Sequence, residues 1–124
     1  MGYDQAAAAR VRRVLSDRAD IVEKRMVGGI SFVLAGRMAC GATGDALMVR
    51  VTRDGRARAL AQPHVRPMEL GGRALAGFVL VEPEGYRTDA ALAAWVGRAL
   101  EVAAALATRR PRPRGPADVR PRLD

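Results

Sequence analysis

The sequence has little cysteine, histidine and aromatic side chain, and each shortage excludes a class of function. Cys40 is the single cysteine, so an intrachain disulfide and a multi-thiolate metal site are both excluded. His64 is the single histidine, and one His with one Cys cannot complete a zinc site without several carboxylates. The carboxylates are scattered, without a pair placed for shared acid–base work. We therefore expect no metal, no cofactor and no enzymatic activity.

Long hydrophobic runs are also missing. No stretch approaches the ~20 consecutive apolar residues that a membrane-spanning helix needs. The first five residues are polar and include the acidic Asp4, whereas a secretion signal begins with a basic region followed by an apolar core. These features predict a cytoplasmic protein that does not enter a membrane.

Positive charge dominates, and almost all of it is arginine. The chain carries 21 Lys and Arg against 13 Asp and Glu, a formal net charge of +8, and Lys24 is the only lysine. Such a ratio, with so much alanine, is typical of GC-rich coding. Residues 110–124 hold five Arg and two Asp, a net +3, which leaves +5 of the +8 for the rest. A balance of this size is compatible with binding to nucleic acid, with binding to an acidic protein surface, or with solubility alone.

The apolar content is sufficient for one domain. A chain of 124 residues has room for a single core and is too short for two domains of ordinary size. Hydrophobic residues make up 49% and aromatics only 4%, so the core is expected to consist of Ala, Val, Leu, Ile and Met. From Arg109 onward the sequence is rich in Pro and Arg and has almost no apolar content. This composition predicts a folded domain over 1–108 and a disordered basic tail over 109–124.

Hydrophobic periodicity predicts a helix at each end of this domain. Asp4 is suited to cap a helix that runs to about Asp17, because apolar residues then recur at three- and four-residue spacing. Thr88 or Asp89 is suited to cap a longer helix that ends near Thr108. These two helices provide apolar stripes that can cover a sheet.

Short apolar runs separated by glycine predict strands between the helices. The runs are 22–27, 30–34, 37–42, 46–51 and 77–81. Ile30, Phe32 and Leu34 are expected to face the core, and Arg50 the opposite side. Residues 52–61 fit either a hairpin or a short helix. The predicted fold class is α+β, a two-layer antiparallel β-sheet meander flanked by N-terminal and C-terminal helices.

Two groups of arginines are candidate contacts for nucleic acid or a partner. One surrounds the strand-to-helix corner near residue 52, and the other lies in the tail. The candidates are Arg50, Arg53, Arg56, Arg58, Arg110, Arg112 and Arg114. An arginine near a phosphate backbone adds salt-sensitive, sequence-independent affinity, although most such groups are simply solvated surface. Phe32, Phe78 and Trp95 are expected in the core, which leaves only Tyr3 and Tyr86 for base stacking and argues against single-strand binding.

A second candidate site is the loop predicted around His64 and Arg66, where two basic groups beside a proline are placed to hold a small anion. A general base needs a nucleophile or substrate group within reach, and no Ser, Thr or Cys is near His64 in the sequence. A surface or loop-anchoring histidine is the simpler interpretation. Cys40, in phase with Met38 in its predicted strand, is expected to be a small buried hydrophobe.

Several motifs, in their order along the chain, resemble the N-terminal domain of the TfoX/Sxy family. The motifs are RMVGGISF (25–32), GRM (36–38), LMVRV (47–51), PHVRPM (63–68), GFVLV (77–81) and LAAWV (92–96). The resemblance covers roughly residues 20–107, and Val27 and Arg37 depart from the family pattern. It implies an α+β domain, favours the helix for residues 54–61 and supplies no catalytic residues. Longer members continue into a helical C-terminal domain, so a stand-alone N-terminal domain is expected here.

The resemblance also gives a direction for function, since the family is linked to natural competence together with a cyclic-AMP-responsive transcription activator. We expect a non-enzymatic regulatory or adaptor domain that binds a protein, such as a transcription factor, near DNA. One alternative is direct, non-specific nucleic-acid binding through the Arg50–Arg58 corner and the tail. Another is a small anion-binding protein or enzyme that uses His64 and Arg66. The sequence leaves the oligomeric state open.

Overall fold

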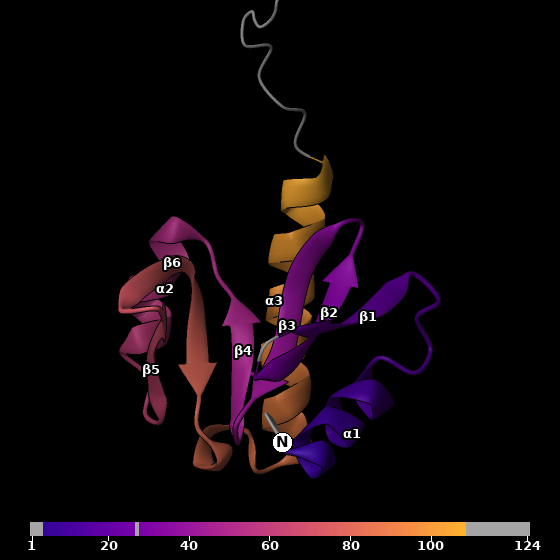
Figure 1. Cartoon of the computed structure of the whole chain (residues 1–124), viewed down its shortest axis with the longest axis horizontal. Helices are drawn as coiled ribbons and strands as arrows, with labels where there is room; N and C mark the ends of the chain where they lie inside the picture. Colours follow the sequence, from indigo (N-terminus) through magenta and orange to yellow (C-terminus); the bar gives the residue numbers. More distant parts are fainter. Residues whose placement is uncertain (1–3, 27, 109–124) are drawn as a thin grey trace, which may run out of the picture.

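The computed structural model describes residues 4–26 and 28–108, and in it helices pack on one face of an antiparallel sheet (Figure 1). In chain order the described elements are α1 (Gln5–Val14), β1 (Ile21–Met26), β2 (Gly29–Leu34), β3 (Arg37–Thr43), β4 (Ala46–Arg50), α2 (Arg53–Leu60), β5 (Val65–Leu70), β6 (Arg73–Val81), the 3-10 turn η1 (Pro83–Tyr86) and α3 (Asp89–Thr108). This arrangement confirms the α+β class with a helix at each end.

The sheet has the strand order β1-β2-β3-β4-β6-β5, and all neighbours are antiparallel. The first four strands form the predicted meander. The fifth strand was not predicted, because Pro67 interrupts the apolar pattern and made residues 63–68 look like a loop. That assignment was wrong for Val65 onward. Proline is tolerated here because β5 is an edge strand, and an edge strand does not need every N–H for pairing.

A register shift in the pairing of β2 with β3 changes which face of the sheet the β3 side chains point to. Phe32 pairs with Cys40 and Val33 pairs with Met38, so Ala39 is an extra residue on β3. One inserted residue reverses the alternation of side chains along a strand. Cys40 therefore faces the main core while Met38 packs on the other face, and the expectation that the two are in phase was wrong.

Side-chain oxygens cap each helix as the sequence indicates. Asp4 accepts from backbone N–H groups in the first turn of α1, and Thr88 rather than Asp89 does so for α3. Thr52 Oγ1 accepts from the N–H of Gly55 at 2.8 Å and caps α2. The ambiguous segment 52–61 is therefore a helix, as the family resemblance implies.

The main core lies between the sheet and the helices. Ile30, Phe32 and Leu34 are buried there, as predicted from their alternation. From α3 the buried core residues are Leu92, Trp95, Val96, Ala99 and Ala103. In Figure 1 the strands lie in front of α3, so the view is onto the face of the sheet away from this helix.

Helix α3 is the longest element and is strongly apolar. Over Asp89–Ala107 its mean hydropathy is 1.5, which by length and composition alone suffices to cross a membrane. Its buried side chains, such as Leu92 and Val96, pack against the sheet. These residues account for the apolar stripe on the side of α3 that faces the sheet, and 28% of the span is buried.

Candidate functional site

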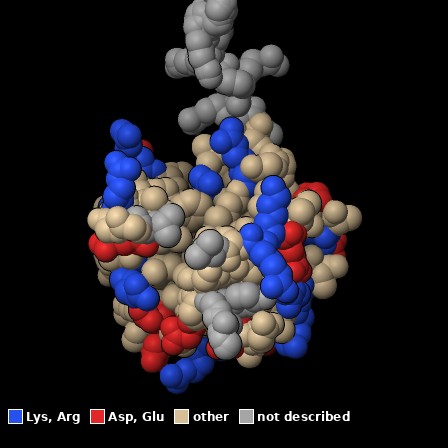
Figure 2. Space-filling view, in the orientation of Figure 1, with Lys and Arg blue, Asp and Glu red and all other residues tan. Residues whose placement is uncertain are grey.

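The face of the sheet opposite the helices carries a second apolar cluster, which we call the methionine face. All of its residues come from strands: Ala46, Met48, Met68 and Leu80 are buried, and Met26, Met38, Leu75 and Phe78 are partly buried against them. It holds four of the five methionines in the sequence. Figures 1 and 2 look onto this face, and in Figure 2 uncharged residues occupy much of its middle, with both basic and acidic residues at its sides.

Gly41 has no side chain and therefore leaves room for the side chain of Met48. A Cβ added to Gly41 would lie 2.6 Å from the terminal methyl of Met48 and would also collide with the carbonyl oxygen of Ile30. The Met48 side chain therefore lies directly over bare backbone, where it is fully buried. Methionine is flexible and polarisable, so an apolar surface made of it adapts to differently shaped partners.

Arg50 lies on the same face. Its guanidinium is 4.5 Å from the centre of the Phe78 ring, and its Nε donates to the carbonyl oxygen of Met38. Burial, and to a lesser extent the neighbouring Arg37, lowers the pKa of Arg50. Among the described residues it forms no ion pair with a carboxylate, so its positive charge is available to a ligand.

Two further cations share this face by strand register. Lys24 lies two residues before Met26 in β1, and Arg66 pairs across the sheet with Leu80. The neighbouring Glu23 lies on the opposite face, where it forms an ion pair with Arg12 of α1. Lys24 and Arg50 give this apolar surface positive charge, whereas Arg66 is paired with Glu82.

Two adjoining hollows, which we call the α2–α3 notch, lie between α2 and the C-terminal half of α3. Their volumes are about 490 Å³ and 250 Å³. The larger is lined by Arg50, Val51, Thr52, Arg53, Asp54, Val102 and Leu106, and the smaller by Val51, Thr52, Gly55, Arg58, Arg98 and Val102. Shared walls at Val51, Thr52 and Val102 join the two.

The notch brings together Arg50, Arg53 and Arg58 of the predicted corner. Arg56 differs from them, because its Nε is buried and has no hydrogen-bond partner in the described part of the chain. Arg98 was missed by the sequence analysis because it lies about 40 positions away on another helix, and no local pattern links it to α2. The predicted tail contacts Arg110, Arg112 and Arg114 lie outside the described residues.

The predicted anion loop has a different structure from the one expected. Arg66 lies in β5 rather than in a loop, and its Nε donates to the carboxylate of Glu82. His64 adopts a positive φ of 66°, and its carbonyl accepts from the N–H of Glu82 at 2.8 Å. Glu82 therefore neutralises the cation that was expected to hold an anion, which weakens that hypothesis.

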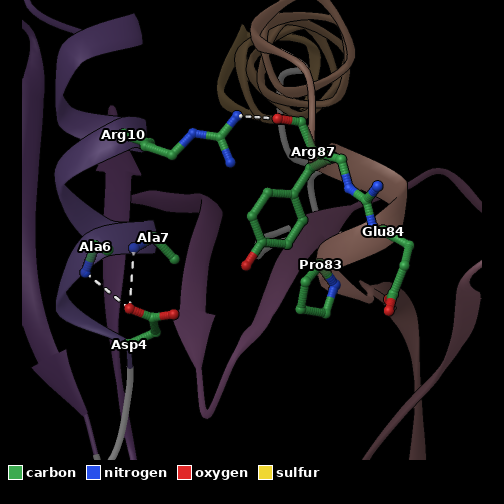
Figure 3. A pocket seen from close by; sticks show the side chains of 8 residues that line it. Asp4, Ala6, Ala7, Arg10, Pro83, Glu84 and Arg87 are labelled. Carbon is green, nitrogen blue, oxygen red and sulfur yellow. Dashed lines mark hydrogen bonds between the residues drawn. The ribbon is translucent and has the colours of Figure 1, made fainter.

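A hollow of about 240 Å³ lies between α1 and η1 (Figure 3). Arg10 reaches across it, donates to the carbonyl oxygen of Arg87 at 3.0 Å, and forms an ion pair with Asp89 at 3.4 Å. Tyr86 also lines it and is buried, with its hydroxyl donating to the carbonyl of Asp45 at 2.6 Å. The expectation that Tyr86 is free to stack on a base was therefore wrong. These contacts join α1 to η1 and α3, which is a structural role.

The one cysteine thiol lies inside the main core. Cys40 is fully buried, and desolvation raises the pKa of its thiol to about 12, so the nucleophilic thiolate is suppressed at neutral pH. Within residues 4–26 and 28–108, no group of three or more His, Cys, Asp or Glu is placed to hold a metal ion. Binding groups on the described surface include the methionine face and the α2–α3 notch.

Comparison with protein families gives one result. The family model described as TfoX N-terminal domain matches residues 13–103, well over half of the chain. No curated protein and no solved structure matches significantly. The matched range contains the whole methionine face and most of the α2–α3 notch.

Proposed function

This chain belongs to the TfoX N-terminal domain family, and from that premise we propose that it is a non-enzymatic regulatory or adaptor domain that binds a protein partner. The observation that carries the proposal is the methionine face, an apolar sheet surface whose cluster, within the described residues, contains no helix residue. The domain acts in the cytoplasm, and the link of the family to competence makes a transcription regulator the class of partner.

The outer layer of the methionine face is suited to protein contact. Met26, Met38, Leu75 and Phe78 are only partly buried, and Val22, which is 55% exposed, joins them because it pairs across from Val33. Contiguous exposed apolar surface with a polar border is typical of protein interaction sites. Methionines let such a surface repack around its ligand.

The positive charges on the methionine face indicate what kind of partner segment binds there. Lys24 and Arg50 lie on this face without a carboxylate partner among the described residues. A partner segment that fills the apolar centre therefore gains from Asp or Glu at its ends. We assign the face to an apolar segment with acidic flanks, supplied by another protein.

The test compares two double variants of the full chain. M26Q/M38Q makes the accessible part of the methionine face polar at nearly constant side-chain length, whereas the matched control M26L/M38L keeps it apolar. Quantitative affinity capture from extract of the source cell is run with wild type and both variants. We expect a protein that wild type and M26L/M38L both retain. The amount of this protein captured by M26Q/M38Q should be lower by at least about tenfold.

Two results would contradict the proposal. One is a set of captured proteins that does not change between M26Q/M38Q and wild type. The other is concentration-dependent self-association of wild type that M26Q/M38Q abolishes, because the occupant would then be a second copy of this chain. Thermal melting of each variant is measured alongside, so that a loss of binding can be distinguished from a loss of folding.

A further inference from the structure

We propose that the α2–α3 notch is a second binding site, which takes the phosphate backbone of a nucleic acid through Arg53, Arg58 and Arg98. Arg53, Arg58 and Arg98 come from α2 and α3, which contribute nothing to the methionine face, although Arg50 of β4 borders both sites. A domain with both sites can hold a protein partner and a nucleic acid at the same time.

The arginines of the notch have no acidic partners among the described residues, a property they share with exposed arginines elsewhere such as Arg13, Arg25 and Arg73. Arg53 and Arg58 project from α2 and Arg98 from α3, and in the described ranges none of them forms an ion pair. By contrast, the ion pairs that the structure does contain are Arg10–Asp89, Arg12–Glu23, Arg18–Asp20 and Arg66–Glu82. The charge at the notch is therefore available to an anion.

The shape and floor of the notch favour a sugar–phosphate chain over an isolated ion. Its floor is apolar, formed by Val51, Val102 and Leu106, and the larger hollow alone has about 490 Å³. A guanidinium binds phosphate through two parallel N–H groups, which a lysine cannot do. Phosphates can thus contact the arginine walls while the sugars lie against the valine and leucine floor.

In the sequence, further positive charge follows the last residue that lines the notch. Leu106 lines it, and Arg109 and Arg110 follow within four positions in the sequence. Figure 2 shows Lys and Arg side chains at the end of the molecule where α3 finishes. The acidic residue in the lining is Asp54, which opposes binding.

The experiment is a fluorescence-anisotropy titration of the full chain with labelled duplex DNA at salt concentrations from about 50 to 200 mM. The notch variant R53Q/R58Q/R98Q is compared with R13Q/R25Q/R73Q, which removes three exposed arginines elsewhere. Both variants lose the same net charge, so they separate a site from a general attraction. Each phosphate contact contributes about 0.9 to the slope of log K against log salt.

We expect the notch variant to lose at least about tenfold in affinity at low salt and to lower the slope by about two to three. The control should lose less than about threefold, and Asp54→Asn should bind more tightly than wild type. Equal losses in the two triple variants, or no DNA binding by wild type at low salt, would overturn the proposal. Competition by inorganic phosphate or a mononucleotide as effective as DNA would overturn the assignment to a polymer. Binding of an acidic protein at the notch in place of DNA would likewise overturn it.

Discussion

The guanidinium of Arg50 lies 4.5 Å from the centre of the Phe78 ring on the methionine face. The same side chain donates from Nε to the carbonyl oxygen of Met38, so one residue of β4 links β3 to β6 on the side of the sheet away from α3. An arginine held in this way is fixed in direction and keeps its charge at the surface. It combines a structural contact with a binding group.

This contact gives the first prediction, a coupling between Arg50 and Phe78. A double-mutant cycle with Arg50→Gln and Phe78→Leu should give an interaction energy of about 0.5–1 kcal/mol, because each single variant already loses the stacking. The free energies come from urea unfolding of all four proteins. Strict additivity of the two single changes would show that the stacking contributes no stability.

The second prediction concerns the hydroxyl of Tyr86. Tyr86→Phe should destabilise the protein by about 1–2 kcal/mol, since it removes the buried hydrogen bond to the carbonyl oxygen of Asp45 and leaves that acceptor unpaired. The ring and its contact with Arg10 stay in place. Thermal melting checks this, and an unchanged melting temperature would mean that water replaces the hydroxyl without cost.

The third prediction is a loss of stability at high pH through Cys40. Burial raises the pKa of this thiol from 9.0 to about 12, so the folded state keeps its proton where the unfolded state releases it. The contribution to stability is complete below pH 9 and falls as the pH rises toward 12, at up to about 1.4 kcal/mol per pH unit. Urea unfolding at several pH values measures the slope.

Cys40→Ala is the matched comparison for that slope. Its stability should fall less steeply above pH 9, while the titration of Tyr86, whose pKa burial also raises, remains in both proteins. Identical pH profiles for the two proteins would show that the thiol is not protected in the folded state.

The fourth prediction uses two glycines with opposite surroundings. Gly41→Ala should destabilise by about 2 kcal/mol or more, because its Cβ meets the Met48 methyl and the Ile30 carbonyl. Gly97→Ala, in the middle of α3 with open space around it, should instead stabilise by about 0.5–1 kcal/mol. Chemical denaturation of both variants decides this, and a tolerated alanine at 41 would contradict the tight packing at the centre of the sheet.

Local patterns were sufficient for much of the fold. Glycine punctuation and alternation predicted the first four strands, and Asp4 marked the start of α1 because its side chain caps the helix locally. The bulge at Ala39 and the insertion of β6 between β4 and β5 depend on pairing between distant segments. Such pairing is not encoded in any single run of residues, so these features were missed.

The same holds for the candidate sites: features that depend on neighbours in sequence were found, and features that depend on tertiary packing were missed. The arginines of α2 were found because they are neighbours in sequence, whereas Arg98 joins them only through tertiary packing. The methionine face left a signal that was not used: in β4, Met48 alternates with the core residues Leu47 and Val49 and so must face the other side. The sequence did not show that, among the described residues, the neighbours of Met48 in this cluster all come from strands.

The most direct test of the central claim is to find out what binds the methionine face. Peptides are selected from an unbiased library on the full chain, and the methionine methyl signals are followed by NMR as the strongest binder is added. The account predicts peptides that combine an apolar centre with Asp or Glu at the ends, shifts at Met26 and Met38, and no binding to M26Q/M38Q. Binders that leave Met26 and Met38 unshifted, or that bind M26Q/M38Q as tightly as wild type, would contradict it.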